Sequence, residues 1–193
     1  MNGLPALGVD VANSETGDEA AICEGVGACC IGIDAFQCPD SNRLGRVTVA
    51  QRMKEKKIRQ ENVGVDGVGV GAGTINALKE IGYKVSNLIG GEKAIVIKDQ
   101  AEKFNNLRSQ MYWQARQDIK NAEVWVPNDP ELIADLCTPK WTENDKVIIV
   151  ESKDEIKKRI GRSPNKGDAF VYWNWVRLKR GNNKTVTVGY GLY

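Results

Sequence analysis

The sequence of 193 residues predicts one α/β domain built on a mixed central sheet. Two observations lead to this prediction. The first 36 residues contain three apolar, strand-like segments without a helix between them, which is typical of an antiparallel opening to a sheet. From residue 48 onward, helix-like and strand-like periodicities alternate, as they do in α/β domains. The length suits one hydrophobic core and is short for two.

The individual elements follow from periodicity and from the turn residues between them. Opening strands are predicted at Leu7–Ala12 and within Ala20–Phe36, which turns near Gly25–Gly27. Further strands are predicted at residues 61–69, 83–89, 124–127 and 146–152, and helices at 48–60, 74–81, 104–120, 130–137, 153–160 and 167–179. The last residues are rich in glycine and asparagine. We therefore expect one domain over residues 1–180 and a loosely structured tail over 181–193.

Composition excludes several classes of protein. No apolar run approaches the roughly 20 residues that a membrane-spanning helix needs. The first ten residues lack the basic and apolar regions of a secretory signal, so we expect an intracellular protein. The chain has no histidine, which excludes Ser-His-Asp and Cys-His nucleophile systems and HExxH zinc sites. Any catalysis must depend on carboxylates, lysines or metal ions.

The five cysteines indicate packing more than chemistry. Cys23, Cys29, Cys30 and Cys38 lie in an apolar stretch without CxxC spacing. A zinc cluster of these four is the alternative, but free cysteine usually behaves as a small buried hydrophobe. We expect buried thiols.

Positive charge is concentrated near the end of the chain. Residues 151–184 contain ten Lys and Arg against four Asp and Glu. Such a segment is typical of a polyanion-binding surface, although a solvated helix face has the same composition. The candidate phosphate contacts are Lys153, Lys157, Lys158, Arg162 and Lys166.

Three aspartates occupy positions where a carboxylate needs a partner. Asp10 and Asp66 lie in apolar strand-like runs, where an unpaired charge costs several kcal/mol, and Asp168 opens a late helix. Alternation places Asp10 opposite Val9 and Asp66 opposite Val65, so both can reach one cleft. Taken singly, Asp168 can be a helix first-turn charge and Asp66 a residue that starts a turn.

A glycine-rich segment, Gly67–Gly73, follows Asp66 and offers a competing interpretation. It formally satisfies GxGxxA between a strand and a helix, where a dinucleotide pyrophosphate would bind. No clear ribose-binding acid follows about 20 residues later. No GxxxxGK[ST] motif is present, so the chain lacks a P-loop ATPase.

Four blocks in this order resemble the nuclease domain of the large terminase subunit of tailed bacteriophages. They are LGVDVANSETGDEAA, VGVDGVGVGAGTINALKEIGYKV, FNNLRSQMYWQAR and IIVESKDEIKKRIGRSPNKGDAFVYW, and they span Leu7 to about Arg180. The resemblance implies a ribonuclease H-like fold, with a central mixed sheet whose first three strands are antiparallel and which is flanked by helices. It also implies metal-dependent cleavage of double-stranded viral DNA concatemers during packaging, with low sequence specificity.

The family's metal ligands match Asp10, Asp66 and Asp168 here. The family often has SPDxAD in its late motif, whereas this chain has Asn165 in place of the first aspartate. We expect two Mg²⁺ or Mn²⁺ ions, bridged by Asp10, with Asp66 and Asp168 on one ion each. Asn165, Asp18 and Glu15 are possible outer ligands, and a neutral Asn165 predicts a weaker second ion.

The resemblance also implies partners and a location. Besides DNA, these are the ATPase domain of the same subunit, the portal and the small terminase subunit, in the cytoplasm of an infected bacterium. Two alternatives to an endodeoxyribonuclease remain open: a nucleotide-binding module that uses Gly67–Gly73, and a catalytically silent DNA-binding or assembly domain.

Overall fold

The computed structural model describes residues 3–15, 17–97 and 100–181, and its centre is a five-stranded mixed sheet in the order β3-β2-β1-β4-β5. The bounds are Pro5–Asp10 for β1, Ala20–Val26 for β2, Cys29–Phe36 for β3, Val63–Asp66 for β4 and Ser86–Leu88 for β5. Strands β1, β2 and β3 pair antiparallel, whereas β4 pairs parallel with both β1 and β5. The antiparallel opening and the mixed sheet are therefore confirmed.

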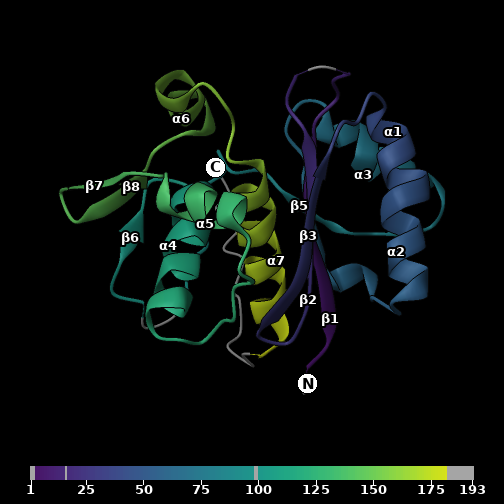
Figure 1. Cartoon of the computed structure of the whole chain (residues 1–193). Coiled ribbons are helices and arrows are strands. Elements are labelled where there is room, and N and C mark those ends of the chain that lie inside the picture. The colour runs from purple at the N-terminus through teal and green to yellow at the C-terminus, as the bar shows by residue number, and fades with distance from the viewer. Residues whose placement is uncertain (1–2, 16, 98–99, 182–193) are drawn as a thin grey trace, which may run out of the picture.

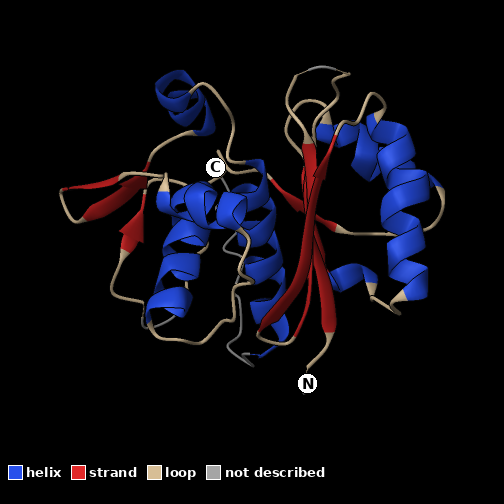
Figure 2. Ribbon diagram, viewed as in Figure 1, coloured by secondary structure: helices blue, strands red, loops and turns tan. Residues whose placement is uncertain are grey.

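Helices cover both faces of this sheet (Figures 1 and 2). One face carries α1 (Ser41–Arg43), the π-helix η1 (Leu44–Val49), α2 (Ala50–Glu55) and α3 (Gly71–Glu80). The other carries α7 (Asn165–Gly181), with α4 (Leu107–Lys120) and α5 (Pro130–Cys137) packed against it. The short 3-10 helix η2 (Gln60–Asn62) leads into β4, and α6 (Lys153–Ile160) precedes α7. Each face has its own apolar core, as a three-layer α/β domain requires.

Two neighbouring glycines let α7 lie very close to the sheet. Gly8 on β1 is paired with Gly64 on β4. A Cβ at Gly8 would lie 2.2 Å from the carbonyl oxygen of Ala169 and 2.2 Å from the amide nitrogen of Trp173, both on α7. Since side chains alternate along a strand, Asp10 and Asp66 project from the same face as these glycines. The close approach thus brings the start of α7 to the ends of β1 and β4.

A second, small sheet lies beyond α4 in Figure 1 and has the order β6-β8-β7. It is formed by β6 (Lys103–Phe104), β7 (Trp141–Asn144) and β8 (Val147–Val150). The sequence predicts a strand over β8, but β7 was not predicted because its four residues, WTEN, are all exposed and lack an apolar alternation.

Several predicted elements need correction. The helix predicted at 104–120 begins at Leu107, because Phe104 belongs to β6 and Asn106 caps the helix. The strand predicted at 61–69 covers only Val63–Asp66. Residues 124–127 are not a strand, since Trp125 makes only an isolated bridge with Cys29 and the following Pro127 has no N–H to extend a ladder. The helix predicted at 48–60 begins earlier, at Ser41, because the Asp40 carboxylate accepts the backbone N–H groups of Asn42 and Arg43. It ends at Glu55, close to Lys57, which has a positive φ of 53°.

Several burial predictions are confirmed. The thiols of Cys23, Cys30 and Cys38 are buried as expected, and helical spacing along 167–179 likewise indicates that Phe170, Trp173 and Val176 pack in the core, where the structure has them. Cys29 is only half-buried. In the described residues, no helix has the length and apolarity to cross a membrane. The division into a domain of 1–180 and a tail of 181–193 stays a prediction: α7 includes Gly181, and 182–193 lie outside the described residues.

Candidate active site

Two predicted carboxylates lie where neighbouring strands end. Asp10 is the last residue of β1 and Asp66 the last of β4, and because these strands are parallel their carboxyl ends meet at one edge of the sheet. Asp10 is buried. The Asp66 carboxylate accepts the backbone N–H of Val68 at 3.0 Å and the Tyr172 hydroxyl at 3.1 Å. Asp66 thus both shapes the following turn and faces α7.

The third predicted carboxylate, Asp168, lies in the first turn of α7 and is completely buried. One of its oxygens, Oδ1, accepts hydrogen bonds from the Arg108 guanidinium at 2.7 Å and from the Tyr112 hydroxyl at 2.6 Å. Both donors come from α4. Since i and i+4 residues share a helix face, Arg108 and Tyr112 reach the carboxylate together, with the guanidinium 4.4 Å from the Tyr112 ring centre.

Lys153 links the carboxylates. Its Nζ donates to both oxygens of Asp10, at 3.0 and 2.8 Å, and lies 3.4 Å from Oδ2 of Asp168. Lys153 is the first residue of α6, where Ser152 and Glu155 form a reciprocal capping box that fixes the start of the helix. Predicted from sequence as a phosphate contact, Lys153 has its ammonium group between two acids in this structure.

The carboxylates differ in electrostatics. Burial raises the pKa of Asp10 to about 7, although the Lys153 ammonium opposes the shift. Burial also raises the pKa of Asp66. Burial acts on Asp168 in the same direction, but Arg108 and Lys153 outweigh it and hold the pKa of this carboxyl below its usual range. The same carboxylates raise the pKa of Lys153 against the effect of its own burial.

The donor set suits a hard divalent cation, because it consists of oxygen ligands and carries an excess of negative charge. When all are ionised, three carboxylates face two cations, Arg108 and Lys153. Asn165 Oδ1 and Asp168 Oδ2 are buried and accept no hydrogen bond from any residue that the structure describes. In residues 3–15, 17–97 and 100–181, no three Cys, Asp or Glu side chains are already gathered as a metal site, and the Lys153 ammonium lies between Asp10 and Asp168, so a cation would have to displace it.

The predicted outer residues differ in position. Asn165 is the first residue of α7 and lies one turn before Asp168, with its side-chain oxygen buried. Asp18 instead forms an ion pair with Lys157, 2.6 Å between Nζ and Oδ2. Glu15 is exposed in the loop between β1 and β2. The structure therefore brings Asn165 close to Asp168 along the helix and gives Asp18 a different partner.

Most of the predicted phosphate contacts are ion-paired within the chain. Lys157 pairs with Asp18, and Arg162 lies 2.5 Å from the buried carboxylate of Asp135. Lys166 pairs with both Asp129 and Glu131, at 2.9 and 2.8 Å. Lys158 is exposed and makes no ion pair with the described residues. The positive charge seen in the sequence is thus largely balanced by acids from other parts of the fold.

Sequence reasoning missed three groups around the carboxylates: Arg108, the Tyr112 hydroxyl and the Tyr172 hydroxyl. Helical spacing could have found them, since Arg108 and Tyr112 are four apart, as are Asp168 and Tyr172. It also missed Asp135, whose carboxylate accepts the N–H of Gly167, directly before Asp168, at 3.2 Å. No sequence pattern links Asp135 to that amide, because the two lie on different helices.

Five of the seven backbone amides of the glycine-rich loop donate hydrogen bonds within the chain. Gly67 donates to the Leu88 carbonyl, and Val68 to Asp66. Gly71, Ala72 and Gly73 donate to carbonyls within the loop itself. A pyrophosphate site at the start of a helix needs such amides free to point at the ligand. The contacts of this loop therefore give no support to dinucleotide binding.

Comparison with known proteins defines the class of this fold. No protein-family model matches the chain, and no curated protein sequence does. Among solved structures, it is similar to the nuclease domain of the large terminase subunit gp2 of bacterial virus Sf6, with a TM-score of 0.70 and 20% identity over 90% of this chain and 88% of the other. It is also similar to the large terminase nuclease of thermophilic phage G20c, with a TM-score of 0.58 and 12% identity over 93% and 83%. The large terminase nuclease domain of Thermus phage P74-26 is similar too, with a TM-score of 0.59 and 12% identity over 94% of this chain and 82% of the other.

The chain therefore has a ribonuclease H-like α/β fold. More narrowly, its fold is that of the terminase large-subunit nuclease domains of several phages. The fold that the sequence blocks predicted is confirmed.

Proposed function

We propose that this chain is a metal-dependent endodeoxyribonuclease that cuts double-stranded viral DNA concatemers during genome packaging, with low sequence specificity. The observation that carries the proposal is the convergence of Asp10, Asp66 and Asp168 at one end of a terminase-type nuclease fold. Structures similar to this chain have been solved with manganese, magnesium and cobalt. Together with the oxygen-only donor set, this supports a divalent cation as cofactor.

Each carboxylate has a distinct role in this proposal. Asp10 would bridge two Mg²⁺ or Mn²⁺ ions, with Asp66 and Asp168 on one ion each and Asn165 as an outer ligand. Such a pair of ions supplies a hydroxide nucleophile and stabilises the leaving oxygen of the phosphodiester. The chain's own residues fix the carboxylates: Arg108 and Tyr112 hold Asp168, while Tyr172 and the Val68 amide hold Asp66.

Lys153 balances part of the negative charge of these carboxylates. Its Nζ lies in contact with Asp10 and within 3.4 Å of Asp168, which reduces the repulsion between two buried acids. DNA would then be held mainly through its phosphates, since phosphate contacts carry no sequence information. Lys158, which is exposed, and the exposed pair partners Lys157 and Arg162 are the first candidates for these contacts.

The packaging role implies partners beyond DNA. We propose the ATPase domain of the same subunit, the portal and the small terminase subunit, all in the cytoplasm of an infected bacterium. The fold similarity to terminase nuclease domains supports this context.

A plasmid assay tests the nuclease proposal. The chain is incubated with supercoiled plasmid and Mn²⁺ or Mg²⁺, with EDTA as the metal-free arm. Nicked and linear products are expected only with metal, and Asp10→Asn, Asp66→Asn and Asp168→Asn are each expected to reduce cleavage to background. Asp34→Asn is the matched control, because Asp34 is an exposed strand carboxylate on β3 that pairs with Arg52. Full activity in a site variant would remove that residue from the site.

The plasmid assay, a gel shift and thermal melting together separate the alternatives. A silent DNA-binding domain would shift the plasmid in a gel without cutting it under any metal condition. A nucleotide-binding module would gain thermal stability from ATP or NAD and none from Mn²⁺.

Asn165 offers a test of ion number. With a neutral amide near Asp168, repulsion between two dications is less compensated, so the second ion should bind more weakly than the first. Asn165→Asp should tighten that second site in a calorimetric titration with Mn²⁺. Two equally tight sites in the unaltered chain would contradict the idea.

A further inference from the structure

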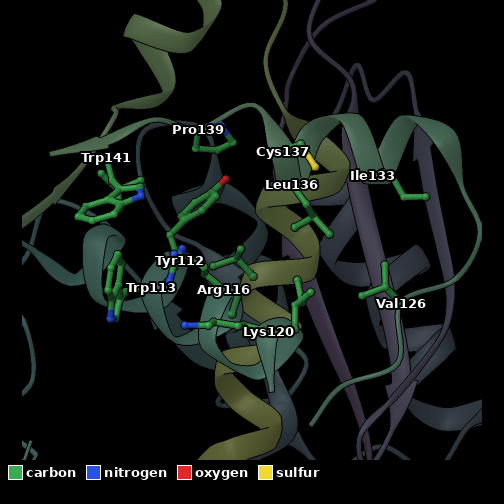
Figure 3. A pocket seen from close by; sticks show the side chains of 14 residues that line it. Tyr112, Trp113, Arg116, Lys120, Val126, Ile133, Leu136, Cys137, Pro139 and Trp141 are labelled. Carbon is green, nitrogen blue, oxygen red and sulfur yellow. The ribbon is translucent and has the colours of Figure 1, made fainter. Parts of the chain in front are cut away.

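A cavity of about 550 Å³ opens between α4, α5 and the small sheet (Figure 3). Residues of α4, α5, α7, β7 and β8 line it, together with Val126 and Pro139. Its apolar walls include Ile119, Ile133, Leu136, Trp141, Val150 and Val171. The Asp10, Asp66 and Asp168 side chains are not among the lining residues, so the cavity is separate from the carboxylate site.

Large apolar side chains are exposed around this cavity. Ile133 and Trp141 are each 43% exposed, and Ile119 is 39% exposed. They come from three different elements, α5, β7 and α4, so their exposure is concentrated by the tertiary fold. A contiguous apolar patch that lines a hollow is typical of an interaction site, whereas single exposed apolar residues need no explanation.

Two cations stand beside the apolar walls. Arg116 and Lys120 belong to α4, one turn apart, and both line the cavity. The Arg116 guanidinium lies 4.7 Å from the Trp113 ring centre and 5.7 Å from that of Trp141, and these two rings are in edge contact at 4.8 Å. Within the described residues, no carboxylate lines the cavity and neither cation has an ion-pair partner.

We propose that this cavity docks a short peptide segment of a partner protein, which inserts a large apolar side chain and places a neighbouring carboxylate against Arg116 and Lys120. The apolar walls define the first requirement, and the unpaired cations define the second. The volume is within the range of pockets that enclose a small ligand, which corresponds to one or two large side chains. Tryptophan and arginine are also the residues most enriched at binding hot spots.

The chemistry of the walls favours a peptide over a nucleic acid. Arginine, lysine and tryptophan could bind phosphate and a stacked base, but a base has polar edges that need hydrogen bonds when buried. Apart from Arg116, Lys120 and Cys137, the walls are aliphatic or aromatic, and the Tyr112 hydroxyl already donates to Asp168. An aliphatic or aromatic side chain loses nothing in such a cavity. The proposal does not depend on nuclease activity.

Selection from a displayed library of random dodecapeptides tests the proposal with the chain of 193 residues as target. The counter-target is the chain with Arg116→Glu and Lys120→Glu, and Lys79→Glu on α3, across the sheet, is the matched control. Peptides that pair Phe, Trp or Leu with a nearby Asp or Glu should be enriched on the unaltered chain and on the control. They should be lost on the counter-target.

A synthetic peptide of the enriched sequence then gives the affinity by fluorescence anisotropy. The double charge reversal, and separately Lys120→Glu or Ile133→Asp, should each weaken binding at least about tenfold, the usual effect of losing a hot-spot contact. The same peptide with Lys in place of its acid should bind the double variant better than the unaltered chain. Thermal melting checks that each variant is folded. If the other variants fail to fold, Lys120→Glu alone tests the proposal, because it is a single change at an exposed residue.

Four results would overturn the proposal. One is the absence of any enrichment over the bare support, and another is peptide binding that is equal on the counter-target. A third is a labelled single-stranded oligonucleotide that competes with the peptide and loses binding in the variant with Arg116→Glu and Lys120→Glu. The fourth is a dimer of the chain in sedimentation that dissociates on Ile133→Asp, because the cavity would then hold a second copy.

Discussion

The Arg108–Asp168 pair at the start of α7 and the Lys157–Asp18 pair of the basic segment use similar residue types in opposite environments. Asp168 is fully buried, and its partner Arg108 is 11% exposed. Lys157 and Asp18, by contrast, are 49% and 37% exposed. In the first region each charge depends on its partner, because neither can reach water. In the second region, water replaces a lost partner at little cost.

This difference separates two functions that the amino-acid composition does not distinguish. The buried cluster fixes the geometry of the candidate site, and its residues are expected to matter for both stability and activity. The exposed Lys157–Asp18 pair is available to exchange its internal acid for a DNA phosphate. Each prediction below tests one side of this comparison, in order of decreasing expected effect.

Gly8→Ala tests how closely α7 must lie on the sheet. The new Cβ would lie 2.2 Å from backbone atoms of α7, which cannot move as a flexible side chain can. We expect the free energy of unfolding to fall by about 3 kcal/mol, the upper end for overpacking, and cleavage to be lost because Asp168 is displaced from Asp10. Urea denaturation measures the change in the free energy of unfolding. Gly32→Ala on β3 is the control, because a Cβ at Gly32 would lie 3.6 Å from its nearest neighbour. Equal losses of stability in the two variants would contradict the close-packing argument.

Asp168→Asn tests the buried cluster directly. Arg108 and Lys153 hold the pKa of Asp168 below its usual range, so the fold favours the charged carboxylate. Removing that charge leaves a buried guanidinium without its acid, and we expect a loss of about 3 kcal/mol in unfolding free energy at pH 7 with EDTA present. Asp66→Asn is the matched variant. Because burial raises the pKa of Asp66, its neutral form suits the fold, and its stability should be equal or higher. The same loss in both variants would refute the distinction.

Tyr112→Phe removes one hydrogen-bond donor from Asp168 and leaves the Arg108 contact in place. The expected loss is about 1 kcal/mol of stability, the usual net value of a hydrogen bond. Cleavage should fall about tenfold, as is common when a residue that orients a ligand is lost. The readouts are urea denaturation and initial rates with Mn²⁺. Tyr83→Phe, on the other face of the sheet, should change neither quantity.

The exposed side of the comparison concerns DNA binding. Lys158→Ala should lower the slope of log K against log salt by about 1, because this lysine has no ion pair with any described residue. Lys157→Ala should lower it less, since Asp18 already neutralises that ammonium, and Asp18→Asn should raise it. Filter binding over a salt series measures all three. Identical slopes in every variant would mean that this helix face does not contact phosphate.

The smallest effect is a pH dependence. Hydrogen bonds from Arg159 lower the pKa of Glu151 from its usual value near 4.5 to about 2. The pair therefore stabilises the folded chain fully above pH 4.5, and this contribution is lost as the pH falls toward 2. Glu151→Gln should lower the melting temperature slightly at pH 6 and leave it unchanged at pH 2. A constant difference across that range would show that the carboxylate charge is not involved.

Local patterns were enough to predict most of the framework. The alternation in LGVDVA and in VGVD placed Asp10 and Asp66 on one face, opposite Val9 and Val65, and the structure has them there. This works because a strand has a strict period of two. Patterns failed in two places. The strand β7 has too few apolar residues to show an alternation, and the apolar run at 124–127 forms only one isolated bridge instead of a strand.

The sequence by itself predicted the class of fold, excluded histidine chemistry and singled out three carboxylates as site candidates. These conclusions depend on composition and on the short-range periodicity of strands and helices. Only the tertiary structure decided which charges meet. It placed Lys153 against Asp10, 143 residues away in the chain, and gave Lys157, Arg162 and Lys166 acids from distant segments. It also gathered Arg116 with exposed apolar residues of two other elements. Electrostatic contacts act over a few ångströms in space whatever the separation in sequence, so no local pattern can reveal them.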